Sequence, residues 1–220
     1  MKALAAFEGS TKRGEDQIAS RINREYWTLT GWVKGWSNVI LDPLSALLAR
    51  LGVQPNVLSL IGLFIASAAG AVVAAGYITY GGLLFFLSGP FDALDGALAR
   101  IAGLETRFGA FLDSFIDRYS EGVVLFGILY WSCLQGSRVL ILLTFLTLLG
   151  SLMVSYSRAR AEGLNISCKV GLFTRLERFI VLTLALLTNQ LLIGLVILAC
   201  LTNFTALQRM FHVYRQSLHQ

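Results

Sequence analysis

Charged residues are scarce in this chain. Asp, Glu, Lys and Arg make up 14% of its 220 residues, and hydrophobic residues make up 55%. A soluble domain typically carries about 25% charged residues, so the composition excludes an ordinary water-soluble protein. Six membrane-spanning helices of about 20 residues each would take up most of the chain. We therefore expect an all-α integral membrane protein with six transmembrane helices.

Cysteine and histidine are also rare. Cys133, Cys168 and Cys200 are odd in number and far apart, with no CxxC spacing. Such a pattern argues against a disulfide framework and against a thiolate metal site. His212 and His219 lie near the C-terminus, where we expect solvated side chains rather than metal ligands. A metal site in this protein would therefore have carboxylate ligands.

Long hydrophobic runs make up most of the chain after its N-terminal segment. They predict the first four spans over residues 57–79, 82–101, 108–134 and 139–156. The first two spans would meet at Tyr80-Gly81. A last apolar run is too long for one span, and Asn189-Gln190 within it predicts a turn between a fifth and a sixth helix. The fifth helix is expected to start near Thr174.

Basic residues fall in alternate connections between the expected spans. The N-terminal segment, the second-to-third and fourth-to-fifth connections and the C-terminus are basic, whereas the other loops together contribute only Arg138. The positive-inside rule therefore places both termini and the basic loops in the cytoplasm. The formal net charge of +5 is spread along one membrane face, so we do not expect nucleic-acid binding.

These patterns divide the chain into three parts. Residues 1–50 form a cytoplasmic N-terminal segment, 51–212 form the six-helix domain, and 213–220 form a cytoplasmic tail. Within the first part, aromatic and aliphatic residues interleave with basic ones over 18–36. That pattern predicts an amphipathic helix that lies in the cytoplasmic interface of the cell membrane, with tryptophans at the level of the lipid headgroups.

Four carboxylates interrupt the second and third expected spans: Asp92, Asp95, Asp113 and Asp117. Each ionisable residue in a span costs roughly 2.5–3.5 kcal/mol on insertion scales, so these residues are functional candidates. Spacings of three and four residues put each pair on one helix face. The connection between the two spans is short, so the four side chains can converge. Oxygen ligands suit Mg²⁺, Mn²⁺ or Ca²⁺, and four acids are enough for a two-metal site.

Residue types and spacing alone leave other interpretations open. The acids could form interhelical ion pairs with Arg100, Arg107 and Arg118. They could also line the path of a cation transporter. A prenyltransferase is a further alternative, because its aspartate-rich segments also bind magnesium pyrophosphate, but the Gly-Ala-Arg residues that follow Asp95 are not typical of one.

The complete pattern over residues 92–117 resembles the signature of the CDP-alcohol phosphotransferase family, D-x2-D-G-x2-A-R-x8-G-x3-D-x3-D, without a mismatch. Pro55-Asn56 at the start of the first span is similar to a Pro-Asn segment of the family. The resemblance covers roughly residues 50 to 180. It implies an enzyme that joins the phosphatidyl group of CDP-diacylglycerol to an alcohol and releases CMP. It also implies two Mg²⁺ or Mn²⁺ ions and a homodimer.

The resemblance also assigns roles by motif position. The four aspartates would bind the two metal ions, and Asp117 would also be the general base that removes the acceptor proton. Glu121, one turn later, is either an outer partner of this site or an ion-pair partner of Arg118. The CDP-diacylglycerol contacts implied are Pro55, Asn56, Val57, Leu58, Gly96, Arg100 and Thr106.

The basic fourth-to-fifth connection bears on the identity of the acceptor. Clustered cations suit an anionic alcohol such as a polyol phosphate, although positive-inside topology alone would also place arginines there. The stretches SRARAEG (157–163) and RLER (175–178) resemble the inositol-phosphate branch of the family, the bacterial phosphatidylinositol phosphate synthases and their archaeal relatives. Arg158 replaces the usual Lys, and Leu176 the usual Pro. The implied acceptor is inositol 1-phosphate, with glycerol 3-phosphate as its main competitor, and its phosphate would be held by Arg158, Arg178 and Arg209.

Overall fold

The computed structural model describes residues 41–168 and 170–218, so the amphipathic helix expected over 18–36 lies outside the described residues. The described residues contain a short helix over 41–50 and six longer helices, which confirms the expected all-α class. The six are α3 (Pro55–Ala74), α4 (Ile78–Ala102), α5 (Arg107–Leu134), α6 (Arg138–Glu162), α7 (Arg175–Leu187) and α8 (Leu191–Ser217).

Four of the described helices, α3, α4, α6 and α8, are long and apolar enough to cross a membrane. Helix α5 has 28 residues, but charged side chains at 113, 117, 118 and 121 interrupt its apolar sequence. Helix α7 has only 13 residues. At a rise of about 1.5 Å per residue it spans about 20 Å, less than a hydrocarbon core of about 30 Å. Helices α5 and α7 are therefore less typical membrane spans than the other four long helices.

The first hairpin differs from the sequence prediction. Helix α3 ends at Ala74 and residues 75–77 form the turn, with Gly76 at a φ of 92°. Glycine favours this left-handed region because it has no Cβ. The expected turn residues Tyr80 and Gly81 lie inside α4. Gly81 packs closely against α3, since a Cβ on it would lie 3.0 Å from the carbonyl oxygen of Ala69. The predicted first span was thus several residues too long.

The start of α7 and the turn after it agree with the sequence prediction. Thr174 is the N-cap of α7, and its backbone N–H donates to Glu177 at 2.8 Å in a capping box. Such reciprocal bonds satisfy backbone donors that a helix start leaves free. Asn189, at a φ of 56°, and Gln190 separate α7 from α8. Helix α8 itself continues to Ser217, into the segment that the sequence assigned to a tail.

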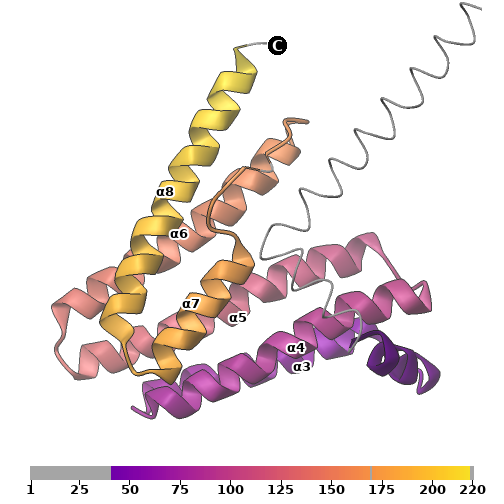
Figure 1. The fold of residues 1–220 in the computed structure, drawn as a ribbon, viewed down its shortest axis with the longest axis horizontal. Coiled ribbons are helices and arrows are strands. Elements are labelled where there is room, and N and C mark those ends of the chain that lie inside the picture. The colour runs from indigo at the N-terminus through magenta and orange to yellow at the C-terminus, as the bar shows by residue number, and fades with distance from the viewer. Residues whose placement is uncertain (1–40, 169, 219–220) are drawn as a thin grey trace, which may run out of the picture.

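The helices pack as two groups that α7 and a contact between α5 and α6 join. Helix α3 packs on both α4 and α5, α6 packs on α8, and α7 contacts both α4 and α8. Figure 1 shows the α3–α4, α5–α6 and α7–α8 turns gathered at the left, with the α4–α5 and α6–α7 connections at the other ends of the helices. This alternating course is the one that the distribution of basic loops predicted.

Helices α3 and α5 approach closely at two glycines. A Cβ on Gly127 would lie 2.2 Å from the carbonyl oxygen of Gly70, and a Cβ on Gly70 would lie 2.5 Å from that of Val123. Small residues allow such close backbone packing between helices in membranes. The crossing lies beside Val124 and Ile128, which are fully buried in the core. It fixes α5, and with it the acids of α5, against α3.

Adding one methyl group at this crossing should destabilise the fold. Gly127→Ala forces α3 and α5 apart, and overpacking of this kind typically costs about 1–3 kcal/mol. We expect a lower midpoint of thermal unfolding in detergent. Gly122→Ala on the same helix is the control, because a Cβ there would meet nothing within 4 Å. Equal losses in the two variants would contradict the crossing as described.

Candidate active site

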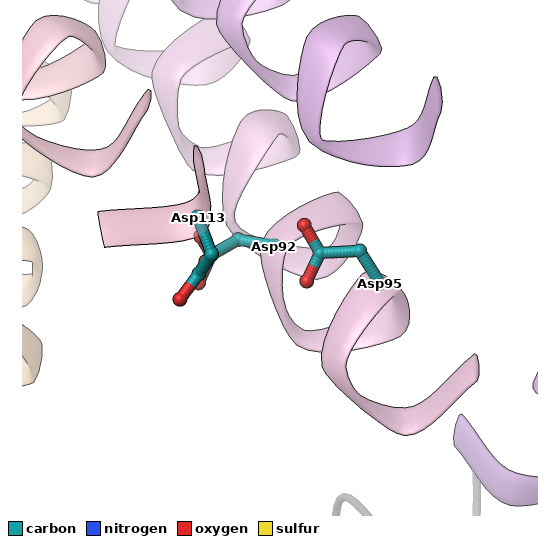
Figure 2. A group of neighbouring side chains, drawn as sticks. All are labelled: Asp92, Asp95 and Asp113. Atoms are coloured by element: carbon teal, nitrogen blue, oxygen red, sulfur yellow. The ribbon is translucent and has the colours of Figure 1, made fainter. Parts of the chain in front are cut away.

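Helices α4 and α5 bring three carboxylates together near their connection. One oxygen each from Asp92, Asp95 and Asp113 lies within 4.8 Å of the others, and Figure 2 shows the three side chains converging from the two helices. Asp95 is buried, and the other two are half-buried. Ser59 of α3 donates a hydrogen bond to Asp95. Three of the four predicted metal ligands therefore share one site, which we call the acidic cluster.

Asp117 lies one helical turn after Asp113 and is only 8% exposed. It is not one of the three mutually close carboxylates of the acidic cluster. Its carboxylate instead pairs with Arg175 at the start of α7, and with Arg118 at 3.4 Å. Arg175 also donates to Asp92, at 2.5 Å. One guanidinium thus connects α7 to the acids of both α4 and α5.

The contact of Arg175 with the acids was missed in the sequence, where Arg175 belonged to the RLER stretch but was given no role of its own. A signal was present: Arg175 is the first residue of α7. The N-terminal end of a helix carries a partial positive charge, which disfavours a cation there. An arginine at this position therefore predicts an acidic partner elsewhere in the fold.

The residues of the acidic cluster fit a divalent metal ion. All their ligand atoms are carboxylate oxygens, which Mg²⁺ and Mn²⁺ prefer. Neighbouring carboxylates that are partly out of water repel each other strongly unless a cation compensates them. Asp92, Asp95 and Asp113 meet both conditions, because they come within 4.8 Å of one another and are at least half-buried. Asp117 could join them as a ligand once its side chain is released from Arg175.

The residues expected to contact the nucleotide lie around the starts of α3 and α5. Pro55 is the first residue of α3. The Thr106 side chain accepts a hydrogen bond from the backbone N–H of Gly109 at 2.9 Å and caps α5. A Cβ on Gly109 would lie 3.6 Å from the Asn56 side-chain oxygen. These two helix starts therefore meet at Gly109, where a larger residue would fill the space.

Other predicted nucleotide contacts differ in their surroundings. Arg100 is exposed near the end of α4, and its guanidinium is the only described group within 4 Å of a Cβ added to Gly96. Val57 is 44% exposed, whereas Leu58 is 4% exposed and packs with Leu94 and Leu98. The structure therefore leaves Gly96 and Arg100 accessible, and it gives the Leu58 side chain a packing role.

Arg178 is held in a buried polar network that joins α5, α6 and α7. It is 3% exposed and donates two hydrogen bonds to Glu121, at 2.9 and 3.1 Å. Glu121 also accepts a hydrogen bond from Ser151 at 2.7 Å. The open question about Glu121 is thus answered in the structure: its partner is Arg178, not Arg118.

The other two arginines expected at the acceptor phosphate have different surroundings. Arg209 of α8 is 4% exposed and donates to the carbonyl oxygens of Val170, at 2.9 Å, and Val154. Arg158 is exposed and pairs with Glu162 at 2.9 Å within α6. The structure therefore buries Arg178 and Arg209 and leaves Arg158 at the surface.

Comparisons with known proteins identify the family. Residues 53–209 match the family described as CDP-alcohol phosphatidyltransferase. The chain belongs to this family of enzymes. It is 38% identical over 182 residues to the archaetidylinositol phosphate synthase of Methanothermobacter thermautotrophicus. The aligned residues cover 80% of this chain and 89% of that protein. The chain is therefore a membrane transferase with relatives that make inositol phospholipids.

Solved structures of a related enzyme support the same assignment. The crystal structure of Mycobacterium tuberculosis phosphatidylinositol phosphate synthase with CDP-DAG bound matches with a TM-score of 0.75 at 32% identity, over 80% of this chain and 94% of that one. A structure of the same enzyme in complex with manganese and citrate matches with a TM-score of 0.74 at 33% identity, over 80% and 89%. The likeness extends over most of both chains, so the protein is a multi-pass membrane protein.

Proposed function

We propose that this enzyme transfers the phosphatidyl group of CDP-diacylglycerol to inositol 1-phosphate, giving phosphatidylinositol phosphate and CMP. The observation that carries the proposal is the acidic cluster, in which Asp92, Asp95 and Asp113 come within 4.8 Å of one another. It lies beside the start of α7, which contributes Arg175 and Arg178. Acids for a metal-bound donor thus lie beside the helix that carries Arg178, a cation for an anionic acceptor.

The proposed enzyme crosses the cell membrane six times and faces the cytoplasm with its active site. In this proposal α5 and the short α7 are the remaining two spans, and both are packed against the others: α5 on α3, and α7 on α4 and α8. The buried charged residues of these helices, Asp117 and Arg178, then face protein rather than lipid, which is where such residues are tolerated in membranes. The basic connections place the acidic cluster at the cytoplasmic side.

Four aspartates would hold two Mg²⁺ or Mn²⁺ ions: Asp92, Asp95, Asp113 and Asp117. Such ions, when bound, neutralise the donor pyrophosphate and stabilise negative charge on the departing CMP. The exposed guanidinium of Arg100 binds a donor phosphate by charge-assisted hydrogen bonds. The nucleotide itself lies against Asn56, Thr106 and the backbone near Gly109.

The transfer forms one phosphorus–oxygen bond and breaks another. The acceptor hydroxyl attacks the phosphorus that carries diacylglycerol, and the bond from this phosphorus to the oxygen of CMP breaks. Asp117 takes the hydroxyl proton on a carboxylate oxygen. A carboxylate shared with a metal is a weak base, so much of the acceleration comes from orienting the acceptor beside it. Burial of Asp117, at 8% exposure, holds the side chain of the base itself in one position.

The acceptor phosphate is bound by arginines from α6, α7 and α8 in this proposal. Arg178 is supported best, because Glu121 fixes its guanidinium in a bidentate pair. These two bonds use Nε and Nη2, which leaves the hydrogens of Nη1 to donate to a phosphate. Arg209 is anchored to backbone carbonyls near the same loop, and Arg158 would approach from the surface.

Release of CMP by the purified protein in detergent tests the proposal. The protein receives CDP-diacylglycerol and Mg²⁺ with inositol 1-phosphate, glycerol 3-phosphate, free inositol or serine in parallel. We expect release with inositol 1-phosphate alone, and its loss when EDTA is added. Release with glycerol 3-phosphate instead would keep the reaction type and overturn the acceptor. No CMP release with any of the four acceptors would overturn the proposed function.

A further inference from the structure

Arg175 contacts the carboxylates that are proposed to bind metal. Its Nη2 atom lies 2.5 Å from Asp92 Oδ1 and pairs also with Asp117 Oδ1. These two acids come from different helices, so one guanidinium occupies oxygens on both sides of the site. A carboxylate oxygen that accepts from a guanidinium at this distance has to break the pair before it can coordinate an ion through the same lone pair.

The backbone of Arg175 is fixed, whereas its side chain has room to move. Thr174 and Glu177 form the capping box that sets the start of α7, so the Cα of Arg175 has a defined position. The Arg175 side chain is nevertheless 44% exposed. It can rotate away from the acids without a shift of α7. Arg178, one turn later, lacks this freedom because it is buried against Glu121.

Electrostatics favour contact of Arg175 with the acids when no metal is bound and favour its release when a metal binds. Without a compensating cation, the carboxylates repel each other, and Arg175 relieves this repulsion. A divalent ion carries twice the charge of Arg175 and repels the guanidinium when it binds to the same oxygens. The start of α7 carries a partial positive charge, which also repels the Arg175 guanidinium once the metal occupies Asp92 and Asp117.

We propose that Arg175 is the internal counter-cation of the metal site, which competes with the metal for Asp92 and Asp117 and is displaced when the metal binds. The inference rests on the proposed function, because it takes the acidic cluster as the metal site. Arg175 is thus a positioning residue: it holds Asp117 in place before metal binding and sets how tightly the metal binds. Its removal should strengthen metal binding, unlike the loss of a residue that supports the site.

Binding of Mn²⁺ to the purified full chain, without substrates, tests this competition. Free Mn²⁺ is measured by electron paramagnetic resonance for the parent, Arg175→Gln, Arg175→Lys and Arg160→Gln. The ion pairs with Asp92 and Asp117 no longer compete with the metal in Arg175→Gln, so its dissociation constant for Mn²⁺ should fall on the order of tenfold. Arg175→Lys keeps the charge but not the planar guanidinium, so its dissociation constant should lie between those of the parent and Arg175→Gln. Arg160 is exposed and has no ion pair with any described residue, so Arg160→Gln should match the parent.

Thermal unfolding separates competition from a merely structural role. In EDTA, Arg175→Gln should unfold at a lower temperature than the parent, because the carboxylates then repel each other without compensation. Saturating Mn²⁺ should narrow this difference, because a tighter ligand stabilises the folded state more. A structural role for Arg175 would leave the same difference with and without the metal.

The outcomes distinguish this inference from the proposed function. Unchanged or weaker Mn²⁺ binding by Arg175→Gln, in a parent that does bind Mn²⁺, overturns the competition and leaves the metal site standing. Failure of the parent and every variant to bind Mn²⁺ overturns both. Tighter binding in Arg175→Gln, with Arg160→Gln unchanged, supports the displacement of Arg175.

Discussion

Replacing Asp117 with asparagine should lower the rate of CMP release roughly a thousandfold, within the range of about 10²–10⁴ that a general base contributes. The amide of asparagine cannot take the acceptor proton, and it is a weaker metal ligand than a carboxylate. It has nearly the shape of aspartate, so the buried position at 8% exposure can still be filled. The measurement is CMP release at saturating donor, acceptor and Mg²⁺.

Asp42→Asn is the matched control for this variant. It makes the same chemical change at an exposed residue of the helix over 41–50, so its activity should stay at the parent level. Both variants should elute as folded protein in detergent, and Asp117→Asn should still bind CDP-diacylglycerol, more weakly than the parent. Turnover by Asp117→Asn within about tenfold of the parent would remove Asp117 as the base.

The acidic cluster could be predicted from sequence because its geometry is mostly local. Asp92 and Asp95 share a helix face by their spacing, and the short connection brings Asp113 of the next helix beside them. Helical periodicity gives the shared face, and the packing of both α4 and α5 on α3 completes the arrangement. The same local rules foresaw the break at Asn189-Gln190, where the polar residues interrupt an apolar run.

The partners of the acids could not be predicted in this way. Arg175 and Asp92 are 83 positions apart, and Arg178 and Glu121 are 57 apart. Such pairs depend on how α7 docks between the two helix groups, and no periodicity in one segment contains that information. The Ser59 hydrogen bond to Asp95 likewise depends on how α3 packs against α4.

The boundary of α3 shows a different limit. No charged residue interrupts the sequence from Val73 through Tyr80, because the turn at residues 75–77 consists of Ala, Gly and Tyr. A hydropathy profile therefore cannot separate the turn from the helices beside it. The backbone conformation of Gly76, with its φ of 92°, makes the turn, and the packing of Gly81 against α3 requires α4 to start before it.

Loss of the Glu121 charge should destabilise the protein more than loss of an exposed surface charge. The side chains of Arg178 and Glu121 are 4% and 13% exposed, so Glu121→Gln leaves a buried guanidinium without a compensating charge. Removing one partner of a buried pair typically costs about 3–5 kcal/mol. We expect a clear fall in the midpoint of thermal unfolding. Arg138→Gln, at an exposed arginine, should change stability by no more than about 0.5 kcal/mol.

The same ion pair should govern acceptor binding. Arg178→Gln removes the proposed phosphate ligand and should raise the KM for the acceptor far more than the KM for CDP-diacylglycerol. Glu121→Gln should act in the same direction, because Arg178 loses the bidentate partner that orients it.

The double variant should lose less stability than the sum of the two single variants, since the second change removes the charge that the first left unpaired. Equal effects on both KM values would overturn Arg178 as an acceptor ligand, and additive stability losses would show that the two side chains act independently.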